Sequence, residues 1–352
     1  MELLKRTIGE VRHPDMAVEK EAREHLDLLT KPRGSLGRME DLAAKYCLIT
    51  GTARPTLGPK RICTFAGDHG VVGEGVSAYP AQVTQQMVHN MLGGGAAINV
   101  LARHVNADLV VVDVGVDDPL AGAKGLARRK VRSGTANIAD GPAMDEKDAV
   151  AALEVGIDLA LQASKEGIAL LGAGEMGIGN TTSSSALFAA LLPCDVERVT
   201  GRGTGIDDLA LERKIAVIKR ALAMNRDRLT DPLGILAALG GLEIAAIAGL
   251  VLGAASRRIP VVVDGFVSSA GALVACRMCD AARGYLFFSH RSAEVGHCAF
   301  FEIFGAKPIL DLDMRLGEGS GAALAMSLVE AAVKIYNEMA TFDAAGVSRR
   351  IG

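Results

Sequence analysis

Six short apolar runs, rich in β-branched residues and mostly bounded by glycine, recur along the chain, and a stretch with helical spacing follows each of them. The runs are RICTFAG (61–67), ADLVVVDVG (107–115), GIALLG (167–172), RIPVVVDG (258–265), GYLFFSH (284–290) and KPILDLD (307–313). Strands that are apolar on both faces and alternate with helices are typical of a parallel sheet that helices cover on both sides. The sequence therefore predicts an α/β fold with a doubly wound, mostly parallel sheet.

Both ends of the chain lie outside this strand–helix series and are predicted to be helical. Residues 2–29 form a charged amphipathic pattern, and residues 321–339 place Ala and Leu at helical spacing. At 352 residues the chain also exceeds the size at which a single core usually stops growing. We therefore expect a large α/β catalytic domain over 28–318 and a small helical domain built from 1–27 and 319–352.

Two further segments have less obvious structures. Residues 117–148 show no clear period and many turn residues, which predicts a long surface loop. Residues 236–255 are apolar enough to imitate a membrane span, but Glu243 lies in their middle and Gly and Ala are frequent. This composition favours a buried, closely packed helix over a membrane-spanning one.

Composition excludes several classes of partner. Apolar residues make up 49% of the chain, charged residues 22%, and the net charge is only -3, so no basic field calls for nucleic acid or an anionic membrane. The six cysteines are too few and too scattered for a disulfide framework, and the N-terminus lacks the apolar core of a secretory signal. We expect a cytoplasmic protein that binds neither nucleic acid nor membrane.

The loops that follow the predicted strands are the expected place for a site, because ligands of open α/β sheets bind beyond the carboxyl ends of the strands. These loops are rich in glycine and each contains a few polar residues. They are GDHG (67–70), GAGEMGIGNTT (172–182), DGFVSSAGAL (264–273), SHRSAEVGH (289–297) and RLGEGSG (315–321).

The 172–182 loop has the features of a phosphate site. Its glycines allow backbone N–H groups to approach a ligand, and Asn180 and Thr181 can begin the helix that follows. A helix N-terminus with free N–H groups favours an anion. Residues 200–208 add more small residues, and Lys214 could neutralise a phosphate, although a solvated helix surface is the commoner place for a lysine.

The same loop allows a second interpretation. Gly172, Gly174 and Gly177 spell G-x-G-x-x-G after a predicted strand. This pattern alone is a weak sign of a dinucleotide site, and it leaves an NAD(P)-binding oxidoreductase as an alternative function.

Two glutamates lie among glycines near the ends of strands. Glu175 follows the 167–172 run, and Glu318 follows the 307–313 run. A carboxylate in a partly apolar cleft has a raised pKa and can accept a proton near neutral pH, so we expect Glu318 to face the ligand pocket as a general base. The alternative for each is an acid that favours a helix N-terminus.

Metal binding is not predicted. Cys276 and Cys279 form a C-x-x-C pair within a helix-like segment, but no second pair follows at the spacing of a zinc site. The histidines and Asp68 show no known metal-binding spacing either.

Nine stretches form an ordered series between about residues 31 and 326. They are KPRGSLGRMEDLA, FAGDHGVVGEGVSAYPAQVTQQMV, GGGAAINVLAR, GAGEMGIGNTTSSSAL, TGRGTGIDD, GGLEIAAIAG, VVDGFVSSAGAL, SHRSAEVGH and LDLDMRLGEGSGAALAM. Together they resemble the nicotinate-nucleotide:dimethylbenzimidazole phosphoribosyltransferase family.

The resemblance implies a Rossmann-like homodimeric enzyme that needs no metal or redox cofactor. It would move the 5-phosphoribosyl group from nicotinate mononucleotide to 5,6-dimethylbenzimidazole, giving α-ribazole 5'-phosphate and nicotinate. It gives Glu318 the role of general base and Glu175 that of a second catalytic carboxylate. The implied base contacts are Tyr79, Pro80, Gln86 and Met87, and the implied phosphoribosyl contacts are Gly174, Gly177, Asn180, Thr181, Gly203, Lys214, Asp264 and Ser292.

One more alternative is a non-catalytic sensor of a nucleotide or ribazole. The presence of both Glu175 and Glu318 speaks against it, because a pure binder has no need of a proton acceptor. The sequence leaves open which benzimidazole-type base is used, because pocket shape discriminates one small group by only about 1 to 3 kcal/mol.

Overall fold

The computed structural model describes residues 1–348, and its centre is a six-stranded sheet in which every pairing is parallel. The strands are β1 (Lys60–Gly67), β2 (Ala107–Gly115), β3 (Ala127–Arg128), β4 (Leu170–Met176), β5 (Val261–Val263) and β6 (Leu286–Phe288). Their order, β3-β2-β1-β4-β5-β6, reverses direction between β1 and β4. This confirms the predicted doubly wound α/β fold and puts the expected ligand crevice beside the ends of β1 and β4.

Five of the six predicted strands are present, and the sixth is wrong. Within 307–313 only Leu310 makes a bridge, to His290 just beyond β6. The chain then leaves the sheet, and Asp313 has a left-handed backbone (φ +53°) that extended strands do not adopt. The short strand β3 was not predicted.

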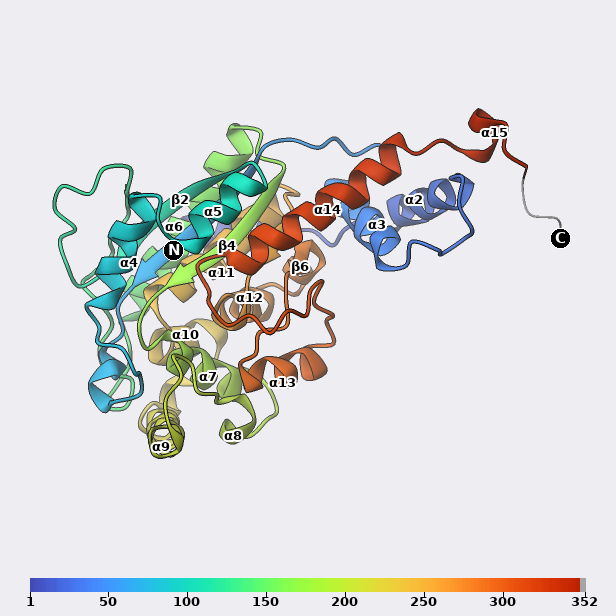
Figure 1. Cartoon of the computed structure of the whole chain (residues 1–352). Helices are drawn as coiled ribbons and strands as arrows, with labels where there is room; N and C mark the ends of the chain where they lie inside the picture. The colour runs from blue at the N-terminus through green and yellow to red at the C-terminus, as the bar shows by residue number, and fades with distance from the viewer. Residues whose placement is uncertain (349–352) are drawn as a thin grey trace.

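Helices cover both faces of the sheet (Figure 1). One face holds α4 (Val83–Leu92), α5 (Ala97–His104) and α14 (Ser320–Glu338), and the other holds α11 (Leu242–Ser256) and α12 (Phe266–Met278), with α6 (Glu146–Lys165) packed on α11. The remaining elements from η1 onward are η1 (Gly70–Glu74), α7 (Asn180–Leu191), α8 (Val196–Val199), α9 (Asp208–Met224), η2 (Arg226–Arg228), α10 (Pro232–Leu239), η3 (Asp280–Tyr285), α13 (Val295–Phe304) and α15 (Phe342–Ala345).

The apolar 236–255 segment is buried, as predicted, but it forms parts of two helices, α10 and α11. Glycine lets α11 approach α6 closely: a Cβ at Gly249 would lie 1.9 Å from the carbonyl oxygen of Leu153, and one at Gly156 would lie 1.8 Å from that of Ala246. Across residues 1–348, no helix has the length and apolar character that crossing a membrane requires.

The N-terminal segment is two helices rather than the single predicted helix. Pro14 lies in the break between α1 (Glu2–Glu10) and α2 (Met16–Leu28), since proline cannot donate the backbone hydrogen bond of a helix interior. Helix α1 packs on α6 and α11, whereas α2 packs on α3 (Arg38–Thr50). Helix α14 runs from the sheet to α3, as Figure 1 shows. The division into two domains remains a prediction, and these contacts associate α1 with the sheet.

The 117–148 segment is not only a surface loop. Leu120, Ile138 and Met144 are buried, and β3 joins the sheet within this segment. Backbone N–H groups of Ala143 and Met144 donate to α10. Apolar residues among turn residues therefore anchor the segment to the core.

Candidate active site

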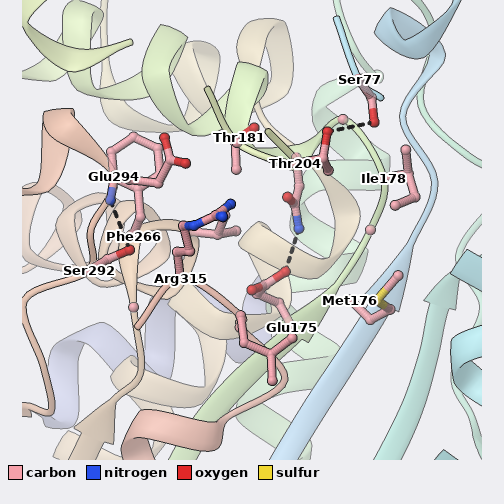
Figure 2. Close-up of a pocket in the computed structure, with 18 of the residues that line it drawn as sticks. Ser77, Glu175, Met176, Ile178, Thr181, Thr204, Phe266, Ser292, Glu294 and Arg315 are labelled. Carbon is pink, nitrogen blue, oxygen red and sulfur yellow. Dashed lines mark hydrogen bonds between the residues drawn. The ribbon is translucent and has the colours of Figure 1, made fainter. Parts of the chain in front are cut away.

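A pocket lies at the carboxyl ends of β4, β5 and β6, next to the point where the strand order reverses (Figure 2). Its walls come from the loops that follow these strands, from the 76–77 segment and from the 203–204 and 315–317 loops. The lining residues are Val76, Ser77, Glu175, Met176, Gly177, Ile178, Gly179, Asn180, Thr181, Gly203, Thr204, Gly265, Phe266, Val267, His290, Ser292, Glu294, Arg315, Leu316 and Gly317.

The loop between β4 and α7 forms one wall of this pocket. Gly179 precedes α7 with a left-handed backbone (φ +93°), which turns the N-terminus of the helix toward the pocket. Asn180 donates through its side chain to Glu175 (Figure 2). The backbone N–H groups of Asn180 and Thr182 donate to the carbonyl oxygens of Gly177 and Gly179. The positive end of the α7 dipole still makes this wall suitable for an anion.

Lys214 lies behind the same wall and is fully buried on α9. Its ammonium group donates to Thr181 Oγ1 at 2.8 Å and to the carbonyl oxygen of Gly201 at 3.2 Å. Burial lowers its pKa to about 8, against the opposing effect of Glu294. The interpretation of Lys214 as a solvated surface lysine is wrong, and its ammonium group contacts the loop before α7 through Thr181.

Glu175 lies on β4 and is 8% exposed. Burial raises its pKa to about 8, and the negative charges of Asp264, Glu243 and Glu318 add to this shift. Burial and these neighbouring charges therefore favour the protonated form of the carboxyl group at neutral pH.

Glu318 is held in a tight turn just before α14. Its backbone is left-handed (φ +65°), and its N–H donates to the carbonyl oxygen of Glu175 at 3.1 Å. Its own carbonyl oxygen accepts from Thr64 Oγ1 at 2.7 Å, and its Oε2 accepts from the backbone N–H of Ile98, in the first turn of α5, at 3.2 Å. Burial raises the pKa of Glu318, although the bond from Ile98 lowers it. Gly317 lines the pocket, whereas the Glu318 carboxylate points to α5.

Asp264 lies behind the pocket and holds the same turn. Its Oδ2 accepts from the backbone N–H of Gly319 at 3.1 Å, and its Oδ1 accepts from that of Ala322 at 2.9 Å. Burial raises its pKa to about 7. Despite this concentration of carboxylates, residues 1–348 contain no group of three His, Cys, Asp or Glu side chains placed to bind a metal ion.

The glycines of the G-x-G-x-x-G pattern do not form the turn that a dinucleotide site needs. Gly172 and Gly174 lie inside β4. A Cβ at Gly174 would lie 2.5 Å from the carbonyl oxygen of Glu318, and one at Gly172 would lie 2.9 Å from Met326 Cε. These glycines allow α14 and the Glu318 turn to pack on the strand.

The other predicted contact residues divide into two groups. Gly177, Asn180, Thr181, Gly203 and Ser292 line the pocket together. None of the four residues predicted to contact the base lines it, although Val76 and Ser77 of the same segment do. These four are Tyr79, Pro80, Gln86 and Met87, of which Tyr79 is 54% exposed.

Sequence reasoning missed several pocket residues. Figure 2 shows Arg315 extending into the pocket from the side of Ser292 and Glu294. Arg315 and Glu294 both belong to loops that follow predicted strands, so their positions could have identified them. Phe266 has the same positional signal, since it lies in the 264–273 loop, but its residue type gave none because buried aromatic residues after strands are usually core.

Comparisons with known proteins agree along the whole chain. Residues 11–347 match a family model described as a phosphoribosyltransferase. The nicotinate-nucleotide-dimethylbenzimidazole phosphoribosyltransferase of Pelodictyon phaeoclathratiforme is 60% identical over 351 residues, which cover 100% of this chain and 99% of that protein. The protein of the same name from Chlorobium chlorochromatii is 59% identical, with 99% of both chains covered. The crystal structure of CobT from Thermus thermophilus aligns with a TM-score of 0.91 at 49% identity, covering 95% of this chain and 100% of that one.

Proposed function

The chain belongs to this phosphoribosyltransferase family, and we propose that it transfers the 5-phosphoribosyl group of nicotinate mononucleotide to 5,6-dimethylbenzimidazole. The products would be α-ribazole 5'-phosphate and nicotinate. The observation that supports this most is the convergence of Glu175, the glycine-rich loop before α7 and the buried Lys214 at the point where the strand order reverses.

We assign the phosphate of the mononucleotide to the loop before α7. Gly177 and Thr181 would offer backbone N–H groups, with Gly203 on the facing loop. Asn180 lines the same wall, but its backbone N–H donates to the carbonyl oxygen of Gly177. Lys214 would supply a positive charge in a place with little water, where an ionic attraction is strong. Ser292 lines the same pocket and is a further proposed contact. Asp264 and Gly174 lie behind the pocket, where they would hold the turn around Glu318 in place and not touch the ligand.

The leaving nicotinate needs little assistance because it departs from a cationic pyridinium, and positive charge develops at the anomeric carbon. Glu175 is the pocket carboxylate best placed to stabilise that charge. The positive charge of the bound mononucleotide would favour the ionised form of Glu175, and the proton that burial keeps on this group would pass to solvent water as the mononucleotide binds.

The incoming benzimidazole needs activation, and we assign its proton to Glu318. One ring nitrogen attacks with its lone pair while the other becomes acidic, so a carboxylate with a raised pKa is a suitable acceptor. The Glu318 carboxylate lies at the N-terminus of α5, and the predicted base contacts lie on α4, which precedes α5, and in the segment before α4. The base would therefore bind on the α4–α5 side of the phosphoribosyl pocket. Attack from the side opposite nicotinate would give the α product.

We also infer a cytoplasmic homodimer, as the family resemblance implies. All six cysteines are free, which fits a reducing compartment. Sedimentation at several protein concentrations would test the dimer.

A chromatographic assay with purified protein, nicotinate mononucleotide and dimethylbenzimidazole tests the function directly. We expect equal amounts of nicotinate and α-ribazole 5'-phosphate to form. Release of nicotinate without the ribazole product would mean hydrolysis, and absence of both products would contradict the proposal. Lys214→Met should raise the Michaelis constant for the mononucleotide, whereas Lys219→Met, on the exposed face of the same helix, should not.

A further inference from the structure

Three buried polar residues from distant parts of the sequence meet beneath the pocket without lining it. His69 follows β1, Ser183 lies in the first turns of α7, and Glu243 lies in the first turn of α11. His69 Nε2 is 2.6 Å from Glu243 Oε1, and His69 Nδ1 is 3.1 Å from Ser183 Oγ. Their hydrogen bonds connect three elements at the back of the proposed phosphate site.

His69 also packs directly against the phosphate loop. A Cβ at Gly177 would lie 3.4 Å from the ring at Nε2, and a Cβ at Gly179 would lie 3.3 Å from the Cβ of His69. Together with the hydrogen bond to Ser183, these distances place His69 directly beside the 177–183 segment, with no room for a side chain at Gly177 or Gly179. A change at His69 would be transmitted to the loop because tightly packed groups cannot move independently.

The surroundings of His69 favour its charged form. Burial alone lowers its pKa, but the charges of Glu243 and Asp68 and the hydrogen bond to Glu243 outweigh this effect, so that its pKa is raised. The N-terminus of α11 favours the negative charge of Glu243. As an imidazolium, His69 donates one N–H to Glu243 and the other to Ser183, which leaves the positive end of the pair toward α7.

We propose that His69 is a positioning residue for the phosphoribosyl group: as an imidazolium held by Glu243, it fixes the 177–183 segment and adds positive charge behind the phosphate. This inference rests on the proposed function, because it takes the loop before α7 to be the phosphate site. It concerns binding of the mononucleotide and not proton removal from the base.

Two variants separate the charge from the packing. Glu243→Gln keeps the shape of the pair and removes its negative charge, whereas His69→Gln removes the ring. We expect either variant to weaken binding of nicotinate mononucleotide about tenfold, as loss of a buried charged hydrogen bond predicts, with a smaller effect on kcat. Calorimetry with nicotinate mononucleotide alone measures this without turnover.

A second histidine provides the matched control. His25 lies on α2 and makes a hydrogen bond to the carbonyl oxygen of Tyr336, far from the pocket. His25→Gln should bind nicotinate mononucleotide as the unchanged protein does. A comparable loss of affinity in His25→Gln would show that the effect comes from general destabilisation, and this would overturn the proposal.

Histidine NMR gives a readout that a purely structural role would not change. The groups facing the pair are Glu243 on α11, Ser183 on α7, Asp68 on its own loop and Glu175 on β4, whose pKa the charge of Glu243 also raises. With ¹³C-labelled histidine, the signal lost in His69→Gln belongs to His69. It should titrate above the ordinary value for histidine in the unchanged protein and at a lower pH in Glu243→Gln.

Binding of nicotinate mononucleotide should weaken as the pH rises through the titration of His69. In Glu243→Gln this weakening should begin at a lower pH, as the NMR titration does. Unchanged affinity in Glu243→Gln, with His69 shown by NMR to be neutral, would overturn the inference even if His69→Gln failed to fold. Product formation by the unchanged protein together with that result would leave the proposed function intact. If no product forms although the mononucleotide clearly binds, the proposed function is contradicted. The binding measurements on the variants still decide the role of His69 in that case.

Discussion

Glu175 and Glu318 occupy matching contexts in the sequence, each among glycines near a strand end, but the structure places them differently. Glu175 lies on a strand, faces the pocket and receives a side-chain bond from Asn180. Glu318 lies in a left-handed turn, and its carboxylate receives a backbone bond from Ile98. The glycines also differ in purpose, since Gly317 makes room for the Glu175 carboxylate: a Cβ there would lie 2.3 Å from its Oε1.

The difference shows how a single pattern can serve two chemical roles. A carboxyl group on a strand is fixed by the pleat, and burial beside other acids keeps it protonated. A carboxyl group in a strained turn depends on everything that holds the turn, because a left-handed backbone is unfavourable for glutamate. Glu318 should therefore be the more sensitive of the two to changes at a distance.

The largest expected effect is that of Glu318→Gln, which removes the proposed proton acceptor. We expect kcat to fall about 10²- to 10⁴-fold, the usual contribution of a general base, with little change in affinity for nicotinate mononucleotide. Glu338→Gln, an exposed change on α14, is the control. Normal turnover by Glu318→Gln would mean that another residue accepts the proton. The two glutamates would then no longer have different chemical roles.

Glu175→Gln should reveal the cost of burying the other carboxyl group. Its pKa is 4.5 when unfolded and about 8 in the native protein, so the native state is relatively destabilised as pH rises between these values. The free energy of unfolding of Glu175→Gln, relative to that of the unchanged protein, should therefore rise with pH. The rise should be up to about 1.4 kcal/mol per pH unit between pH 5 and 8. Urea unfolding across this range measures the gain. A constant difference would mean that Glu175 is not protonated in the native state.

Gly174→Ala tests the dependence of Glu318 on packing. The new Cβ would lie 2.5 Å from both the carbonyl oxygen of Glu318 and the backbone nitrogen of Gly319. We expect a loss of roughly 1 to 3 kcal/mol in unfolding free energy, typical of overpacking, together with a lower kcat. Gly141→Ala, where a Cβ meets nothing within 4 Å, should change neither. A stable Gly174→Ala enzyme with normal kcat would show that the turn tolerates displacement.

The architecture was largely predictable because apolar runs bounded by glycine are local signals. They identified five strands and the parallel sheet, since a strand buried on both faces needs a continuous apolar run. The failures were those that depend on tertiary context. Residues 307–313 have the composition of a strand, but only Leu310 makes a bridge and Asp313 turns with a left-handed backbone. The strand β3 is too short to leave a pattern.

The site was predictable where it follows from loop position and unpredictable where it depends on burial. The 172–182 loop was found because glycines before a helix have a known use, and its residues do line the pocket. The sequence of α9 does not show that Lys214 is buried, because nothing in its pattern distinguishes Lys214 from the exposed lysines of the chain. The charge on Asp264 gave no indication that both its oxygens bind backbone groups of a helix distant in sequence.

The smallest expected effect, and the sharpest test of the comparison, is that of Asp264→Asn. Asparagine offers one acceptor where Asp264 offers two, so either Gly319 or Ala322 would lose its partner. The stability cost should be about 1 kcal/mol, as for loss of a helix cap, and kcat should fall because the Glu318 turn loosens. Asp231→Ala is the control for stability alone, since Asp231 caps α10 away from Glu318 through a single oxygen, Oδ1, which accepts from the N–H groups of Leu233 and Gly234. Equal stability losses with a lower kcat only in Asp264→Asn would show that the turn transmits the change. Equal kcat values would mean that Glu318 keeps its position without this cap, and the two glutamates would then be equally robust.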